Sequence, residues 1–161
     1  MAELQSGHAT TIRVSAEGRS FGVADDGRGH AVDRSVAGVP YLDFVYTHLD
    51  YPFESAVDAP VQLHCIGVSL LNTLCSELSV TVRKPDKALR LWFRDGQLDQ
   101  SELKASEAME TGTEISGTIH PRIQAGDVDL VRLEEWLVSL LVASPSLKII
   151  FNGVELQAAR R

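Results

Sequence analysis

The sequence lacks the features of a membrane-embedded or secreted protein. No apolar run approaches the roughly 18 residues that a membrane-spanning helix needs, and residues 1–5 lack the basic segment and apolar core of a signal peptide. Cysteine is scarce, with only Cys65 and Cys75. Both fall in one predicted helix, where roughly 15 Å separates them, which is too far for a disulfide. We therefore expect reduced, buried thiols in a cytoplasmic protein that contacts no membrane.

Positive charge is also in deficit. The chain has 15 Lys and Arg against 22 Asp and Glu, so its formal net charge is −7. Proteins that bind nucleic acid through its phosphates usually present a basic surface. We therefore expect no direct nucleic-acid binding.

Short motifs for catalysis or metal binding are missing as well. The pattern Gly-x-Ser-x-Gly does not occur, and no Cys–His arrangement for nucleophilic catalysis is visible. The histidines are scattered, and none are paired at the spacing of zinc ligands. They are His8, His30, His48, His64 and His120. The sequence therefore predicts no catalytic residue and no metal site.

What the chain does have is the patterning of an ordinary globular domain. Its 161 residues, 44% hydrophobic and 23% charged, favour one domain over 1–161 without internal repeats. Alternation predicts strands at 11–15, 20–24, 79–83, 89–94, 113–119, 147–151 and 154–156, with a short strand and an exposed connection in 97–110. The strongest hairpin signal is Asn152-Gly153, and Asp95-Gly96 predicts a second tight turn.

Helical spacing predicts four helices, which lie at 1–6, from Pro40 to Pro52, at 65–78, and from a cap at Asp127 or Asp129 to Pro145. The helix at 65–78 has a wide apolar stripe made of Ile66, Leu70, Leu74 and Leu78. Its narrow polar side is made of Ser69, Asn72, Thr73 and Ser76. A stripe that wide is typical of a central helix laid on a sheet. We expect helices on one face of a mixed sheet, an α+β two-layer sandwich.

The stretch Asp25-Asp26-Gly27-Arg28-Gly29 follows the strand predicted at 20–24. It places a carboxylate at the mouth of a loop whose glycines let the backbone turn and approach a ligand closely. Alone, such a pattern more often belongs to a simple turn. Two further segments favour a ligand-binding role, residues 63–74 at the start of the central helix and Thr111-Gly112-Thr113 at the start of a strand.

In this order and spacing, the three segments resemble the ATPase domain of gyrase B and of its topoisomerase IV counterpart. That domain belongs to the GHKL family, with Hsp90, MutL and histidine kinases. The resemblance extends from about residue 7 to about residue 150, and its most specific parts are Asp25–Gly29 and Thr111–Thr113. It implies a two-layer α/β sandwich of the Bergerat type.

The resemblance assigns roles on the adenine side of a nucleotide pocket. Asp25 matches the residue that accepts a hydrogen bond from the adenine amino group, which suits an ionised, acceptor-only carboxylate. Gly27 lets the base lie against the backbone, and the Thr113 hydroxyl supports the same base. In the gyrase branch the Arg of this loop, here Arg28, covers the adenine and pairs with a helix Glu, here Glu3. The alternatives are a turn residue for Asp25 and a solvated helix end for Glu3.

The phosphate side departs from the family pattern. The family lid, Gly-Gly-Leu-His-Gly-Val-Gly, corresponds to residues 61–67, where only the final glycine, Gly67, is kept. His64 matches a family histidine, or alternatively packs beside the helix start. Asp58 stands where the gyrase branch has a lysine, and its charge repels phosphate. The predicted nucleotide-binding residues are Glu3, Asp25, Gly27, Arg28, Gly29, His64, Gly67 and Thr113.

The hydrolytic residues of the family have no match. Its general-base Glu and magnesium-binding Asn correspond to positions before Met1, on the helix whose end is 1–6. The arm that dimerises gyrase B and the second domain with its phosphate-sensing lysine have no match either. Without the Asn, magnesium loses its protein ligand, and without the Glu no group activates water. We expect no magnesium binding and no hydrolysis without a partner chain.

Three functions follow from this pattern. The first is a binding or regulatory module that takes ATP, ADP or a protein partner without hydrolysis. The second is the ATP-binding subunit of a type IIA topoisomerase-like assembly that a partner chain completes. The third is a structural or interaction domain without a ligand.

Overall fold

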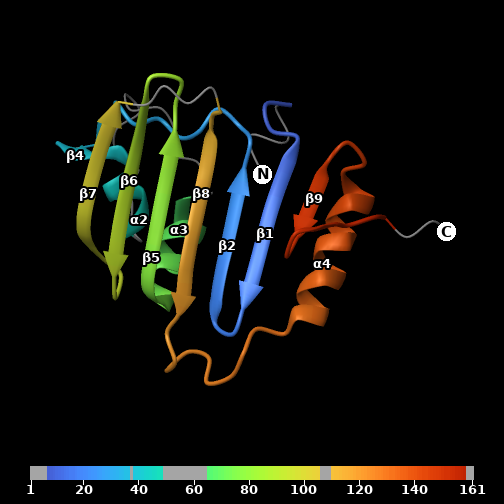
Figure 1. The fold of residues 1–161 in the computed structure, drawn as a ribbon. Helices are drawn as coiled ribbons and strands as arrows, with labels where there is room; N and C mark the ends of the chain where they lie inside the picture. Colours follow the sequence, from blue (N-terminus) through green and yellow to red (C-terminus); the bar gives the residue numbers. More distant parts are fainter. Residues whose placement is uncertain (1–6, 37, 49–64, 106–109, 159–161) are drawn as a thin grey trace.

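The computed structural model describes residues 7–36, 38–48, 65–105 and 110–158 (Figure 1). An eight-stranded mixed sheet organises the fold, in the order β10-β9-β1-β2-β8-β5-β6-β7. Its strands are β1 (Thr11–Glu17), β2 (Ser20–Asp25), β5 (Cys75–Arg83), β6 (Lys87–Arg94), β7 (Gln97–Ala105), β8 (Gly112–Ile119), β9 (Lys148–Phe151) and β10 (Val154–Glu155). A small second sheet pairs β3 (Ser35–Val36) with β4 (Val39–Pro40).

Tight turns join neighbouring strands where the sequence predicts them. Asp95 and Gly96 have φ of 48° and 81°, and Asn152 and Gly153 have φ of 46° and 84°. A turn with two consecutive residues of positive φ matches the right-handed twist of the flanking strands. Asn-Gly and Asp-Gly favour this kind of turn. Both predicted hairpins are confirmed.

Three described helices, α2 (Tyr41–Thr47), α3 (Cys65–Leu74) and α4 (Leu130–Ala143), accompany the sheet (Figure 1). Cross-strand pairing puts the side chains of one row on one face, and this row is Val14, Val23, Ile115, Val80 and Leu91. Val14 packs with α4, whereas Val80 and Leu91 pack with α2. The helices therefore cover the same face, and the predicted α+β two-layer sandwich is confirmed.

The core on this face has two parts, separated by a strip of sheet. One cluster joins α2 to β5 and β6, and the other joins α4 to β1 and β9. Strands β2 and β8 lie between the strands that carry the two clusters. Val23 of β2, on the helix-covered face, is still 40% exposed. Phe21 of β2 and Ile115 of β8 pack against the cluster that contains α2, so among the described residues the strip is only partly covered, with Val23 as its exposed position.

The central helix is shorter than predicted. α3 ends at Leu74, and β5 begins at the next residue, Cys75, which pairs with Ile119. The predicted stripe is wrong as well, because Leu70 is 47% exposed whereas Ser69 and Asn72 are 1% exposed. Asn72 is buried because its side-chain amide donates to the carbonyls of Tyr46 and Gly96, at 2.9 and 3.0 Å.

Cys75 is a buried, free thiol, as predicted. It is 1% exposed, and burial raises the pKa of its thiol to about 11. A thiol with that pKa stays protonated and unreactive at neutral pH. The side chain of Cys65 lies outside the described residues.

Other boundaries differ from the prediction by a few residues. α2 ends at Thr47, ahead of Pro52, because His48 adopts an extended conformation, and Pro40 is its N-cap. β7 continues through nine residues, longer than the short strand expected. Asp129, one of the two predicted caps, accepts from the backbone N–H of Arg132 at 3.0 Å and begins α4.

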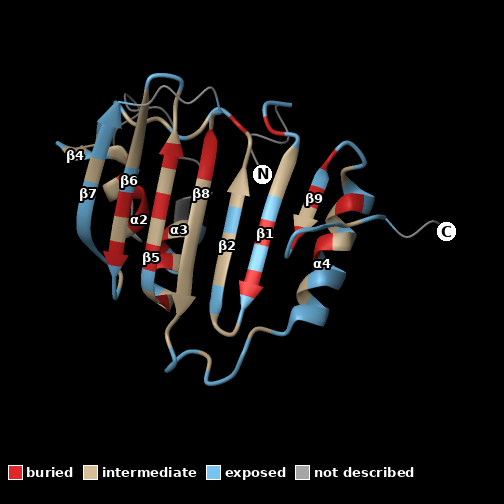
Figure 2. Cartoon of the chain, viewed as in Figure 1, coloured by how far each residue is buried: buried red, intermediate tan, exposed pale blue. Residues whose placement is uncertain are grey.

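Burial follows the layering. Figure 2 shows buried residues concentrated on β5, β6 and the start of β8, whereas β7 is exposed along most of its length. Within the described residues, no helix is long and apolar enough to cross a membrane.

Candidate nucleotide-binding site

Asp25 is the last residue of β2, and its carboxylate is held in one orientation. Its Oδ1 accepts a hydrogen bond from the Gly27 N–H at 2.8 Å, which closes an Asx turn. Within the described part of the chain, Oδ2 has no hydrogen-bond partner. Asp25 is half-buried, so part of the residue is accessible in the described structure. The turn alternative and the ligand role are therefore compatible.

The segment Thr111-Gly112-Thr113 lies against the same loop. The Thr111 hydroxyl donates to the Gly27 carbonyl at 2.7 Å. Gly112 has φ of 146°, and a Cβ there would lie 2.1 Å from the Asp25 carbonyl oxygen. Only glycine permits so close an approach, so the two predicted motifs meet at this point.

Thr113 is brought beside Asp25 by strand register. Ala24 of β2 pairs with Glu114 of β8, so one further step places Asp25 opposite Thr113, with both side chains on the helix-covered face. Thr113 is 6% exposed, and its hydroxyl has no hydrogen-bond partner among the described residues. An acceptor-only group and a hydroxyl thus share this end of strands β2 and β8.

The rest of the loop is fixed by β5 and the turn after it. Lys84 donates from Nζ to the carbonyls of Arg28 and Gly29, both at 2.8 Å. Gly29 has φ of +69°, and a Cβ there would lie 2.9 Å from the Arg83 carbonyl. Gly29 therefore serves the packing of the loop against the sheet.

Asp26 has a different role from Asp25. Its carboxylate accepts from the N–H groups of Thr10 and Thr11, at 2.7 and 2.9 Å, and from the Thr10 hydroxyl at 2.8 Å. Burial opposes the charged form, but these hydrogen bonds outweigh it and lower the pKa of the carboxyl to about 2. Asp26 anchors the start of β1.

The chain is similar to known proteins in sequence and in fold. The B subunit of DNA topoisomerase 4 from Pseudomonas aeruginosa is 29% identical over 93% of this chain and 25% of its own length. The gyrase B protein of Mycolicibacterium smegmatis is 34% identical over 75% of this chain and 18% of its own length. The topoisomerase IV ATP-binding domain of Francisella tularensis, solved with a small-molecule inhibitor, superposes with a TM-score of 0.78 at 22% identity, over 93% of this chain and 74% of that chain. No family model matches the chain.

The chain is a GHKL ATPase-like domain. It spans a quarter or less of the length of these curated relatives. The fold that the sequence resemblance implied is therefore confirmed.

Some predicted site residues of this GHKL-like domain lie outside the described residues, namely Glu3, Asp58 and His64. Gly67 lies in the first turn of α3 and is exposed, and a Cβ there would meet nothing within 4 Å. Packing against described residues therefore does not require glycine at 67. Arg28 is exposed on the loop. All eight nucleotide-binding assignments remain predictions, namely Glu3, Asp25, Gly27, Arg28, Gly29, His64, Gly67 and Thr113.

Sequence reasoning gave no role to three residues that shape the site. Thr111 and Lys84 hold the loop through its backbone carbonyls, and Asp26 holds the strand beside it. Thr111 and Asp26 lie within the quoted motifs, whereas Lys84 lies in none. Asp26 lies next to Asp25 in a sequence pattern that occurs both in ligand sites and in simple turns, so the pattern does not show the role of Asp26.

Proposed function

We propose that this GHKL-like domain binds an adenine nucleotide, ATP or ADP, and does not hydrolyse it alone. The observation that carries the proposal is the Asp25 carboxylate, whose Oδ1 is occupied by the Gly27 N–H at 2.8 Å while Oδ2 remains available. A carboxylate fixed in plane by one internal bond offers its second oxygen in a defined direction. The exocyclic amino group of adenine is a donor of the required kind.

Two neighbouring groups support the same ligand. The Thr113 hydroxyl both donates and accepts, so it suits a ring nitrogen or a water beside the base. Gly27 is buried and carries no side chain, which lets a flat ring approach the backbone. Guanine has a carbonyl where adenine has the amino group, so Asp25 selects against it by placing two acceptors together.

The absence of hydrolysis rests on the sequence. The lid segment supports it, because residues 61–67 keep only Gly67 of the family's glycines, and Asp58 stands where the gyrase branch has a lysine.

A second candidate is supported by the relatives. Both are named as subunits, and each is much longer than this chain. This favours an ATP-binding part of a topoisomerase-like assembly, in which a partner chain supplies the catalytic groups. Magnesium-dependent turnover that requires the partner distinguishes it from the first candidate.

Calorimetric titration tests the proposal. The purified chain is titrated with ADP, ATP, a non-hydrolysable ATP analogue and GDP, each with and without magnesium. We expect saturable binding of the adenine nucleotides, no effect of magnesium, and no phosphate release. Tighter binding with magnesium together with phosphate release would contradict the non-hydrolysing role. No binding of any nucleotide would leave the third function, a domain without a ligand.

A further inference from the structure

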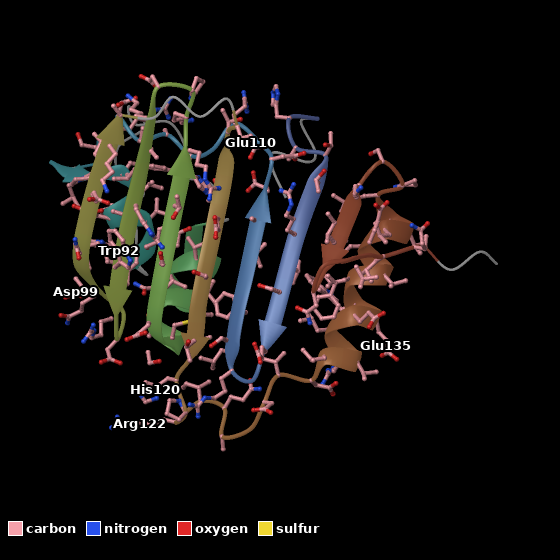
Figure 3. All side chains as sticks on the ribbon, viewed as in Figure 1. Trp92, Asp99, Glu110, His120, Arg122 and Glu135 are labelled. Carbon is pink, nitrogen blue, oxygen red and sulfur yellow. The ribbon has the colours of Figure 1, made fainter. Side chains whose placement is uncertain are left out.

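The face of the sheet opposite the helices carries a hollow of about 480 Å³. That volume lies within the range of small-molecule sites, roughly 300–1,000 Å³. The side chains on this face that line it come from five strands. They are Ser20, Glu77, Ser79, Trp92, Arg94, Asp99, Gln100, Ser116 and Thr118. Figure 3 shows Trp92 and Asp99 near the β6–β7 side of the sheet.

Strand register explains why the sheet is hollowed here. One row of paired residues crosses the sheet from Gly22 through Ser116 and Ser79 to Trp92. Side chains on one row share a face, so three small residues lie beside a large aromatic one. The small residues form a floor, and Trp92 forms a wall above it.

The Trp92 ring lines the hollow and is contacted by a cation. Arg90 lies two residues earlier on β6, and its guanidinium carbon stacks 4.9 Å from the centroid of the ring. Arg90 does not line the hollow, whereas Arg94, two residues later, does. The guanidinium therefore covers one face of the ring from outside the lining of the hollow.

Hydrogen-bonding groups line the same hollow as the Trp92 ring. Glu77 and Asp99 accept, Arg94 donates, and the Gln100 amide does both. Arg94 and Asp99 form a loose pair, with 3.8 Å between Nη2 and Oδ2. Two carboxylates against one guanidinium make the lining net negative, which disfavours a polyanion such as single-stranded nucleic acid.

We propose that this hollow binds a neutral saccharide of about two units. The apolar face of a pyranose ring stacks on an aromatic ring, and its hydroxyls take the donors and acceptors that Glu77, Asp99 and Gln100 offer. The site lies on the opposite face of the sheet from Asp25 and Thr113. Its occupation therefore does not depend on nucleotide binding.

Tryptophan fluorescence tests the proposal, because the chain has only two tryptophans. The second, Trp136 on α4, is 58% exposed, so Trp136→Phe leaves Trp92 as the sole reporter. Maltose, cellobiose and diacetylchitobiose are titrated into this variant at millimolar concentrations. We expect a saturable change in Trp92 emission with at least one of them.

Two substitutions on β5 localise the binding. Ser79→Leu fills the floor beside Trp92, whereas Thr81→Leu adds the same side chain opposite Arg90, outside the lining of the hollow. We expect Ser79→Leu to weaken binding about tenfold or more and Thr81→Leu to leave it unchanged. Circular dichroism confirms that both variants fold, and calorimetry on Trp92→Ala, which lacks the reporter, should show the same loss.

Three results would overturn the proposal. The first is a Trp92 signal that no disaccharide changes. The second is an equal effect of the two leucine variants on binding. The third is tight binding of a thymidine oligonucleotide that Ser79→Leu removes, because it would assign the hollow to nucleic acid instead.

Discussion

The Thr111 hydroxyl lies 2.7 Å from the carbonyl oxygen of Gly27, 84 residues earlier in the chain. This hydrogen bond joins the segment before β8 to the loop after β2. The two motifs that suggested a nucleotide site in the sequence are therefore one structural unit. Beside this hydrogen bond, the Asp25 carbonyl lies so close to Gly112 that no side chain fits at position 112.

Removing that hydroxyl should loosen the site. Thr111→Val keeps the shape of the side chain but leaves the Gly27 carbonyl without its donor. We expect a loss of about 1 kcal/mol in the free energy of unfolding, measured by urea denaturation. Thr111→Ser, which keeps the hydroxyl, is the control and should lose less. Equal stability of Thr111→Val and the wild type would show that the bond is not needed.

The adjacent residues Asp25 and Asp26 should respond differently to replacement by asparagine. Asp26→Asn weakens three hydrogen bonds that stabilise a charged acceptor, so we expect the free energy of unfolding to fall by roughly 1–3 kcal/mol. Asp25→Asn retains an oxygen for the Gly27 N–H, so stability should change little. Thermal unfolding of both variants checks this, and the reverse order of stabilities would refute the division of roles.

The Asp26 carboxyl also predicts a pH dependence. Its folded-state pKa of about 2 is below the ordinary 3.8, so the ionised form stabilises the fold. That contribution is complete above about pH 4 and is lost as the pH falls through about 2. Urea denaturation across this range should show a shallower fall in stability for Asp26→Asn than for the wild type. Parallel curves would mean that another carboxylate is responsible.

Glycine at 112 should be irreplaceable, whereas glycine at 67 should not be. Gly112→Ala places a Cβ against the Asp25 backbone at a φ of 146°, and the conformation alone costs roughly 1–3 kcal/mol. Gly67→Ala adds a Cβ that meets nothing within 4 Å in a helix, where alanine is favoured by about 1 kcal/mol. Thermal unfolding should therefore show a lower Tm for the first variant and an unchanged or higher Tm for the second.

Local chemistry made much of this fold predictable, and distant contacts set the rest. Asn152-Gly153 demands a tight turn, and the alternation in β5 and β6 reports one buried face. The end of α3 was not predictable, because residues 75–78 continue a helical apolar spacing until pairing with Ile119 makes them a strand. Asn72 was predicted on the polar side of the helix. Its burial was not predictable, because its acceptors, the Tyr46 and Gly96 carbonyls, are distant in sequence.

The candidate site divides in the same way. Asp25 and Thr113 were predicted from their residue types and spacing, and their role in binding stays a prediction. Lys84 was not predicted, because it binds the backbone carbonyls of Arg28 and Gly29. Every residue has such a carbonyl, so the sequence gives no signal for the contact. Only the fold brings the Lys84 ammonium group to these two carbonyls.

Lys84 supplies a further prediction. Lys84→Met removes both hydrogen bonds from Nζ to the loop while keeping most of the apolar stem. We expect weaker ADP binding from a less ordered Asp25 loop, with a smaller effect from Lys84→Arg, which retains a cation. Lys104→Met, on the exposed strand β7, is the control. Calorimetry that gives the same affinity for Lys84→Met and Lys104→Met would show that the loop is held without Lys84.

The central claim is that Oδ2 of Asp25 receives the amino group of adenine. Calorimetric titration of ADP into the wild type and into Asp25→Asn, both shown to be equally folded, tests it most directly. The account predicts saturable binding to the wild type and an affinity at least about tenfold weaker for Asp25→Asn, as expected for losing a hydrogen bond to a charged group. Equal affinities would contradict the claim and leave Asp25 as a turn residue.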